Sequence, residues 1–209
     1  MCGFAGFVHY GQRLNIEIVK NMADAIQHRG PDDLGCELFE DINFQVGLGF
    51  RRLSIVDLSL QGHQPMFDKS GNYCIVFNGE VYNFQEIRTD LFQLGYEFNS
   101  HTDTEVVLYS YIHWGKECLD KFNGMFAFCI YDKKSKELFI CRDRAGVKPL
   151  YYYFNGESLL FGSELKALIK FPSFKKDIEF EAIVDYFENG YISNPLTIYK
   201  NTYKLEPGH

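Results

Sequence analysis

Residues 2–9 read CGFAGFVH, and from Gly3 onward they predict a strand that starts at the terminus itself. Cys2 stands directly behind the initiator methionine, and a small residue there allows Met1 to be removed. Removal would leave Cys2 with a free α-amino group of pKa about 7.7–8.0. A thiol needs a neighbouring base to supply thiolate, and such an amine can serve. The opening residues therefore predict a strand with a candidate cysteine nucleophile at its start, although many proteins have cysteine at position 2 by chance.

Outward from this strand, further strands alternate with a few helices. Asn155-Gly156 is a strong hairpin dipeptide, and Thr102 to Glu105 has the pattern of a capping box that opens a helix. In chain order, the other expected elements are a helix capped by Asn15 that ends before His28, a hairpin at 35–41 and 45–50, a buried strand at 73–78, a helix from Asn83 to Gly95, a helix at 104–114, strands at 125–132 and 137–142, and a hairpin at 149–154 and 158–162.

These strands suffice for two or more multi-stranded sheets, whereas only about three long helices are expected. This balance favours the α+β class over a doubly wound βαβ array. The sequence contains no GxGxxG run and no GxxxxGKS/T run, which agrees with that choice.

The pattern of long strands and helices ends near residue 171. FPSFKKD at 171–177 indicates a connector, 179–188 indicates a short amphipathic helix, and an irregular, proline-containing tail follows. Nothing near His209 signals a closing element, so we expect a domain boundary there. The predicted organisation is one domain over residues 2–170 and a connector over residues 171–209 that leads to a further domain.

The 209 residues include 21 Lys and Arg against 28 Asp and Glu, a formal net charge of −7. This balance argues against a nucleic-acid-binding surface, which needs clustered basic residues. The start lacks the basic segment of a signal peptide, and no apolar run approaches the roughly 18 residues of a membrane span. We therefore expect a cytoplasmic protein that binds neither nucleic acid nor membrane.

The six cysteines form no CxxC pair, and Cys74, Cys129 and Cys141 fall inside apolar, strand-like runs. A free thiol in such a run behaves as a small hydrophobic residue. Without an export signal we expect no disulfide framework, and no pattern of ligands predicts a metal site.

An ordered set of short motifs runs through the chain. In chain order they are CGFAG from Cys2, HRGPDD at 28–33, RRLSIVD at 51–57, FNGEVYN at 77–83, HTDTE at 101–105, GMFAF at 124–128, RDRAGVKPLYY at 142–152 and SELKAL at 163–168. Together these motifs resemble the glutaminase domain of asparagine synthetases, a class II glutamine amidotransferase with an N-terminal nucleophile. Phosphoribosylpyrophosphate and fructose-6-phosphate amidotransferases share the Cys-Gly start but lack the RLSIVD and KPLYY signatures.

The resemblance implies an αββα sandwich of two mainly antiparallel sheets, with the nucleophile at the end of an inner strand. Cys2 matches that nucleophile. Asn78 and Gly79 match the two donors of an oxyanion hole, one a side-chain amide and the other a backbone N–H. One preorganised donor of this kind is worth roughly 2.7–4 kcal/mol. Glycine at position 79 is expected to let the backbone approach the substrate without a Cβ in the way.

The resemblance also implies a site for free L-glutamine. Arg52 matches the residue that grips the α-carboxylate, a task suited to a planar, bidentate donor. Asp103 matches the partner of the α-ammonium group. One cationic and one anionic anchor define a free amino acid. The other residues matched to this pocket are Leu53, Ile55 and Val56, through their main chain, and Glu80.

Each of these residues also has a simpler interpretation. Asn78-Gly79 alone would most often form a hairpin turn. Asp103 could be only an acidic residue in the first turn of a helix, where the helix dipole favours a negative charge. Arg52 could belong to a solvated pair of arginines. All of these interpretations must hold together for the functional one to fail. We expect His63 and His101 to be structural, as lone histidines most often are. Ser54 and Ser163 lie outside any GxSxG elbow of a hydrolase.

The implied reaction is hydrolysis of glutamine to glutamate and ammonia, for which this domain needs no cofactor. In the family, the ammonia passes to a C-terminal domain that amidates aspartate with ATP and Mg²⁺, and no SGGxDS loop of that domain occurs here. Two alternatives stay open. The parent enzyme could amidate another carboxylate, such as a surface-sugar acid, or the chain could be a non-catalytic relative that keeps the fold as a regulatory module. A homodimer also stays open.

Overall fold

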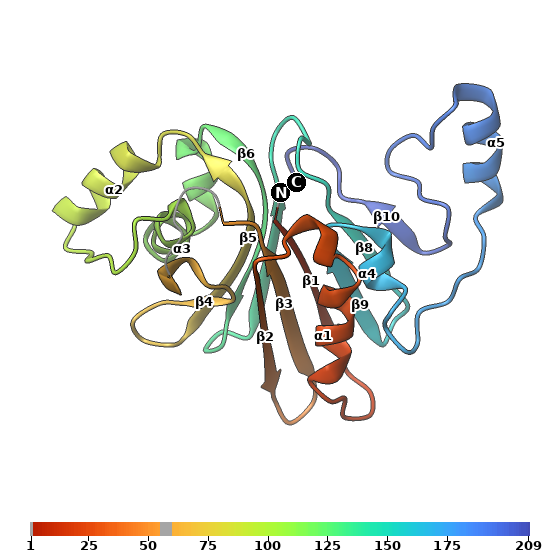
Figure 1. Ribbon diagram of the computed structural model, residues 1–209, viewed down its shortest axis with the longest axis horizontal. Helices are drawn as coiled ribbons and strands as arrows, with labels where there is room; N and C mark the ends of the chain where they lie inside the picture. The colour runs from red at the N-terminus through yellow and green to blue at the C-terminus, as the bar shows by residue number, and fades with distance from the viewer. Residues whose placement is uncertain (1, 55–59) are drawn as a thin grey trace.

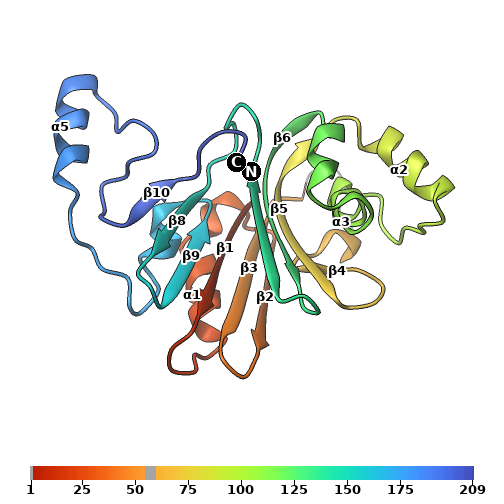
Figure 2. The same cartoon turned by 180° about the vertical axis from the view of Figure 1, so that it is seen from behind.

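The computed structural model describes residues 2–54 and 60–209. Two sheets pack face to face, and helices cover their outer faces (Figure 1). The view from behind shows the same two sheets side by side (Figure 2). The α+β class and the αββα arrangement expected from the sequence are therefore confirmed.

The larger sheet has six strands in the order β10-β8-β9-β1-β3-β2, and every pairing in it is antiparallel. Strand β1 lies inside this sheet, where it pairs with β3 from Gly3 onward and with β9 from Ala5 onward. The strands are β1 (Gly3–His9), β2 (Asp33–Glu40), β3 (Gln45–Arg52), β8 (Tyr151–Phe154), β9 (Ser158–Gly162) and β10 (Thr202–Lys204).

The smaller sheet has four strands in the order β4-β5-β6-β7, also all antiparallel. Its strands are β4 (Met66–Phe67), β5 (Tyr73–Val81), β6 (Gly124–Asp132) and β7 (Glu137–Arg142). Helices α1 (Glu17–Asp24) and α4 (Leu165–Leu168) cover the larger sheet, and α2 (Phe84–Gln93) and α3 (Asp103–Trp114) cover the smaller one. The remaining helices are α5 (Phe180–Asn189) and the 3₁₀ turns at Gln27–Arg29, Leu60–Gly62 and Gly115–Lys121.

The core consists of three apolar layers, one between the sheets and one under each helical layer. Side chains alternate between the two faces of a strand. In β1, Phe4 and Val8 enter the layer between the sheets, while Ala5 and Phe7 pack under α1 and α4. Both faces of β1 are buried, which explains why its sequence is apolar without alternation.

Strand β5 is longer than the expected segment 73–78 and continues to Val81. Asn78 pairs with Ala127 and Gly79 pairs with Phe126 of β6. The simpler interpretation of Asn78-Gly79 as a hairpin turn is therefore wrong, because β6 provides a partner strand that the local dipeptide pattern cannot reveal.

Two helix starts differ in detail from the sequence patterns. The first helix begins at Glu17 with Ile16 in the cap position, although the Asn15 side chain accepts a hydrogen bond from the Glu17 N–H at 3.0 Å. Thr102 caps α3 as expected by accepting from the Glu105 N–H at 3.4 Å. A reciprocal capping box would have the Glu105 carboxylate accept from the Thr102 N–H. It accepts instead from the N–H groups of residues 99 and 100.

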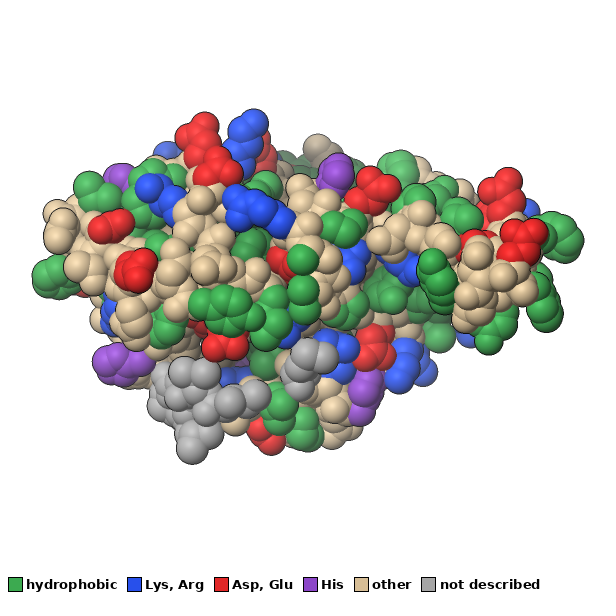
Figure 3. All heavy atoms as spheres, turned by 90° about the horizontal axis from the view of Figure 1, so that it is seen from above, with side chains coloured by type: hydrophobic (Ala, Val, Ile, Leu, Met, Phe, Trp, Pro, Cys, Tyr) green, Lys and Arg blue, Asp and Glu red, His purple; other side chains and the backbone are tan. Residues whose placement is uncertain are grey.

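The residues after 170 contribute more than a connector to the fold. Strand β10 pairs with β8 at the edge of the larger sheet. Helix α5 stands away from the sandwich and carries exposed apolar side chains, which are visible at its end of the molecule in Figure 3. Those spaced along one side of it are Phe180, Val184 and Phe187, and the exposed Tyr191 follows shortly after its end.

No helix within residues 2–54 and 60–209 is long and apolar enough to cross a membrane. All six cysteines are free thiols.

Candidate active site

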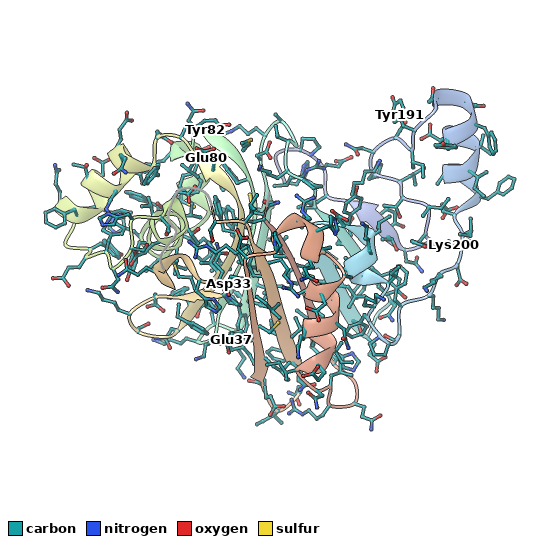
Figure 4. The ribbon with its side chains drawn as sticks, in the orientation of Figure 1. Asp33, Glu37, Glu80, Tyr82, Tyr191 and Lys200 are labelled. Carbon is teal, nitrogen blue, oxygen red and sulfur yellow. The ribbon has the colours of Figure 1, made fainter. Side chains whose placement is uncertain are left out.

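A cavity of about 280 Å³ opens at one end of the layer between the sheets. It is lined by the start of β1, the end of β3, the middle of β5 and the N-terminal turn of α3. Figure 4 shows the side chains of this region, with Glu80 labelled on β5 and Asp33 labelled at the start of β2. Segments far apart in the sequence therefore meet in one hollow.

The strand alternation that builds the core also aims three polar side chains into this cavity. Phe4 on β1, Phe50 on β3 and Val76 on β5 face the layer between the sheets. Two residues along each strand, the same face presents Cys2, Arg52 and Asn78, and all three line the cavity. The site is thus the polar end of the apolar layer between the sheets.

The Cys2 thiol lies against the main chain of Leu53. The Leu53 N–H donates to Sγ at 3.3 Å, and Sγ lies 3.5 Å from the Leu53 carbonyl oxygen. Burial raises the pKa of Cys36 to about 11 and the pKa of Cys118 and Cys141 to about 12, which leaves those thiols unreactive at neutral pH. Cys2 is the cysteine that lines the cavity.

The position of Cys2 is fixed by residues of the HRGPDD and SELKAL motifs. Arg29 donates from Nε to the Cys2 carbonyl at 2.9 Å and from a terminal nitrogen to the Glu164 carboxylate at 3.1 Å. His28 lies 2.9 Å from the same carboxylate. Two motifs separated by more than 130 residues therefore hold the start of β1.

The two neighbouring arginines of β3 point to opposite faces. Arg51 forms an ion pair with Asp24 of α1, whereas Arg52 is buried and lines the cavity. A Cβ at position 62 would overlap the guanidinium group of Arg52, so Gly62 leaves the room that this group occupies. Arg52 is therefore no member of a solvated pair.

The turn at residues 28–33 lies across the end of β3. The Asp32 N–H donates to the Arg52 carbonyl at 3.1 Å, and the Asp32 carboxylate accepts from the Ser54 N–H at 2.8 Å. A Cβ at Gly30 would overlap the carbonyl group of Arg51. The Arg-Gly turn is thus required by the close approach of these two backbones.

Asn78 provides a donor that the protein itself does not use. Its side chain is 1% exposed and lines the cavity. The Nδ2 atom is buried and has no hydrogen-bond partner among residues 2–54 and 60–209. A buried amide nitrogen left unsatisfied costs about 1–3 kcal/mol, which a ligand oxygen in the cavity would offset.

The edge of β5 that faces away from β6 presents one further N–H to the cavity. The Phe77 N–H on this edge donates to the Gln64 side chain at 2.6 Å, and the Val81 N–H donates to the Asp103 carboxylate at 3.1 Å. Alternate residues of a strand direct their N–H groups to the same edge. The N–H of Gly79, which lies between them and lines the cavity, therefore points the same way.

Glycine at position 79 has a different structural reason from the expected one. A Cβ there would lie 2.5 Å from the Met125 carbonyl oxygen and 2.6 Å from the Phe126 Cα, both on β6. A side chain at this position is excluded by the close approach of β6.

Asp103 lines the cavity and has a carboxyl group whose pKa is strongly changed by burial. Burial raises its pKa from 3.8 to about 6, although the Val81 and Thr104 N–H groups act in the opposite direction. The nearby negative charge of Glu80 adds to the increase in the pKa. A ligand cation placed here would stabilise the ionised form.

The other sequence-predicted residues fall into three groups. Leu53 touches Cys2 and Glu80 lines the cavity, whereas Ile55 and Val56 lie outside the described residues. His63 lies 2.7 Å from the Asp33 carboxylate and does not line the cavity. No three His, Cys, Asp or Glu side chains of the described part of the chain cluster as metal ligands would.

Sequence reasoning missed Gln64 and Lys148, which also line the cavity. Lys148 is buried, and burial followed by the charge of Arg29 lowers its pKa. The Asp143 carboxylate holds its loop by accepting from the N–H groups of Val147 and Lys148 at 3.0 Å. A lysine inside the apolar KPLYY run was a usable signal for Lys148. No local pattern marks Gln64.

The family model of a glutamine amidotransferase domain matches residues 1–209. A putative glutamine-hydrolysing asparagine synthetase of Methanocaldococcus jannaschii is 44% identical over 99% of this chain and 42% of its own length. A glutamine-hydrolysing asparagine synthetase of Bacillus subtilis is 39% identical over the whole chain and 34% of its own length. The chain thus spans less than half of these relatives.

Among solved structures, the glutamine phosphoribosylpyrophosphate amidotransferase of Bacillus subtilis superposes with a TM-score of 0.66. The match covers 85% of this chain and 45% of that protein, at 18% sequence identity. This likeness supports the fold alone.

Proposed function

Because the chain belongs to the glutamine amidotransferase domain family, we propose that it hydrolyses L-glutamine to glutamate and ammonia with Cys2 as the nucleophile. The observation that carries this proposal is the unsatisfied Nδ2 donor of Asn78, in the same cavity as the thiol of Cys2. A non-catalytic relative that bound nothing in this cavity would leave the buried Nδ2 donor unsatisfied, at a cost of about 1–3 kcal/mol.

Glutamine would be held at its amino-acid end by two charges. The Arg52 guanidinium group is suited to the α-carboxylate, and the Asp103 carboxylate is suited to the α-ammonium group. These groups come from β3 and α3, on two sides of the cavity. The side-chain amide would then extend toward Cys2 and Asn78.

The reaction would begin when the Cys2 amine, free after removal of Met1, takes the thiol proton. The thiolate adds to the amide carbon, and the oxyanion accepts hydrogen bonds from Asn78 Nδ2 and the Gly79 N–H. The carbon–nitrogen bond breaks as the Cys2 ammonium returns its proton to the departing amide nitrogen, which leaves as ammonia. Water then hydrolyses the γ-glutamyl thioester, which releases glutamate and restores the thiol.

The ammonia acceptor belongs to the same proposal. The relatives are named glutamine-hydrolysing asparagine synthetases and extend well beyond the matched length, so this domain would supply ammonia to a C-terminal part that amidates aspartate. ATP and Mg²⁺ remain predictions for that part, and a cytoplasmic location remains a prediction for the whole protein. Amidation of another carboxylate would leave the glutaminase step unchanged.

The test of the proposal is release of glutamate and ammonia from L-glutamine by the purified chain. Intact mass should show that Met1 is absent, and asparagine should serve poorly as a substrate. A correctly processed, folded chain that releases no glutamate from glutamine would refute the proposed function.

Arg52→Ala should raise the KM for glutamine far more than it lowers kcat. The guanidinium group would bind the α-carboxylate equally in the ground and transition states, so its loss removes binding common to both. Truncating one member of a desolvated charge pair costs about 2–5 kcal/mol, or roughly thirtyfold or more in KM. Steady-state kinetics over a wide range of glutamine concentration measures the split.

Arg51→Ala is the matched control, because Arg51 is the neighbouring buried arginine on the opposite face of β3. It should lower stability through the lost ion pair with Asp24 and leave KM near its original value. An equal rise in KM for both variants would mean that Arg52 acts only on the fold.

Glutamine binding should weaken as the pH falls through about 6, the value to which burial raises the pKa of Asp103. Below this pH the carboxyl group is neutral and no longer attracts the α-ammonium group, which stays protonated throughout. Calorimetry on a Cys2→Ala chain, which cannot turn over, should show the dissociation constant rising about tenfold per pH unit below 6. Asp103→Asn should bind weakly at every pH, and a persistent acid limb in that variant would contradict the assignment.

The same pKa shift predicts the direction of the stability change. The folded-state pKa of Asp103 lies above the unfolded value, so its contribution to stability is present below pH 3.8 and is lost as the pH rises through 6. At pH 7.5 the ionised carboxylate therefore destabilises the ligand-free protein, by at most about 3 kcal/mol. Asp103→Asn should raise the melting temperature of the ligand-free chain at pH 7.5 while it impairs binding.

A further inference from the structure

The segment between β3 and β5 contains a buried glutamine for which the proposed chemistry has no task. Gln64 is 4% exposed and lines the cavity. Its Oε1 accepts from the Phe77 N–H at 2.6 Å, and its Nε2 donates to the Phe77 carbonyl at 3.4 Å. Nε2 also donates to Thr104 Oγ1 at 3.2 Å. One side chain thus joins β5 to the N-terminal turn of α3.

The side chain of Gln64 takes the place of a strand at this point. Strand β4 pairs with β5 through Met66 opposite Ile75 and Phe67 opposite Cys74, a register that places position 64 opposite Phe77. A primary amide offers the same N–H and C=O groups as a peptide unit. Gln64 therefore continues the hydrogen-bond ladder for one more residue with its side chain.

The end of this ladder determines which part of β5 faces the cavity. Gln64 occupies the N–H and C=O of Phe77, and the Asp103 carboxylate occupies the N–H of Val81. The peptide group of Gly79 lies between them on the same edge. Gln64 and Asp103 therefore mark the two ends of the edge that can receive a ligand.

We propose that Gln64 is a positioning residue for glutamine hydrolysis, which holds the Gly79 N–H and the Asn78 side chain where the oxyanion forms. This inference rests on the proposed function. Asn78 directly follows the bonded Phe77, so a shift of the strand there moves both donors together. A misplacement near 1 Å at a reacting centre can cost about a hundredfold in rate.

The Thr104 hydrogen bond extends this role to the other end of the substrate. Thr104 directly follows Asp103, the proposed partner of the α-ammonium group. Gln64 therefore connects the strand that carries the oxyanion donors to the helix that carries the anionic anchor. Its loss should disturb the transition state first, because oxyanion geometry is more exacting than charge pairing.

The test is the kinetics of Gln64→Leu, which fills a similar volume and removes all three hydrogen bonds. We expect kcat for glutamine hydrolysis to fall by roughly tenfold to a hundredfold, with KM changed less than about threefold. Titration of Cys2 with a diazoketone analogue of glutamine gives the fraction of competent sites, and kcat is expressed per competent site.

Gln45→Leu is the matched control. Gln45 is 1% exposed and also binds a backbone pair, accepting from the Leu14 N–H at 2.7 Å and donating to the Leu14 carbonyl at 3.1 Å. It lies at the opposite end of β3 from Arg52 and does not line the cavity. It should lower the melting temperature without changing kcat per competent site. Equal losses of kcat in the two variants would overturn the proposal.

Gln64→Glu keeps the test decisive if the leucine variant fails to fold. The introduced carboxyl group can accept from the Phe77 N–H in either form, but it can donate only when protonated. Its kcat, relative to the unaltered chain at the same pH, should therefore rise as the pH is lowered from about 8 to about 6. A ratio that does not change with pH would overturn the proposal, whereas an inactive unaltered chain would instead refute the proposed function.

Discussion

Cys2→Ala should leave a folded chain that releases no glutamate from glutamine above the uncatalysed background. The thiolate forms the only covalent bond to substrate in the proposed reaction, so its removal should cost roughly 10⁴-fold or more in kcat. The fold should survive, because the hydrogen-bond partner of the thiol in the described part of the chain is the Leu53 main chain, and the Cys2 carbonyl that binds Arg29 remains. The measurement is glutamate release, paired with a melting curve.

The same residue supports a second arm that tests the α-amine as the base. A chain that retains Met1, or carries any residue before Cys2, has its amine in a peptide bond. We expect it to fold and to lose nearly all glutaminase activity, and proteolytic exposure of Cys2 should restore that activity. Full turnover from a chain whose intact mass includes Met1 would end the amine-as-base mechanism and leave Cys2 dependent on another base.

Asn78→Ala should lower kcat by roughly 10²–10³ with only a modest change in KM, because the side chain would act on the oxyanion and not on the bound ground state. Its buried Nδ2 has no partner in the described part of the chain. Truncation therefore removes an unsatisfied group, and we expect no loss of stability from that atom. A large loss of activity without a fall in melting temperature is the distinguishing result.

Asn83→Ala is the control for this prediction. Asn83 follows the same strand, and its side chain donates to the Lys121 carbonyl at 2.9 Å and accepts from the Asn123 N–H at 2.9 Å, outside the cavity. It should lower stability and leave kcat unchanged. If KM rises and kcat holds in Asn78→Ala, Asn78 binds the substrate instead of the oxyanion.

Much of the fold could be predicted from local sequence because the longer strands are marked by their own apolar composition. The segments 3–9 and 137–142 match β1 and β7, and the Asn155-Gly156 hairpin lies where expected between β8 and β9. The missed strands, β4 and β10, have two and three residues. Strands so short contain no complete alternation and are defined only by their partners.

The site could be predicted only in part, for a related reason. Cys2, Arg52 and Asn78 lie in motifs that the sequence displays, and they meet in one cavity. The task of Gln64 depends on a register between two strands and on a helix start 40 residues away. A one-dimensional pattern contains neither distance, so such a residue is recognised only once the chain is folded.

The exposed apolar side of α5 affects how strongly copies of the isolated chain attract one another in solution. Phe180 and Phe187 are 72% and 82% exposed on a helix that stands away from the sandwich (Figure 1). Such an apolar patch favours association of two copies, whereas the net charge of −7 opposes their approach. Added salt shortens the screening length from about 10 Å at 0.1 M to about 3 Å at 1 M. The second virial coefficient of the chain should therefore fall, and its sedimentation coefficient rise, as salt is added.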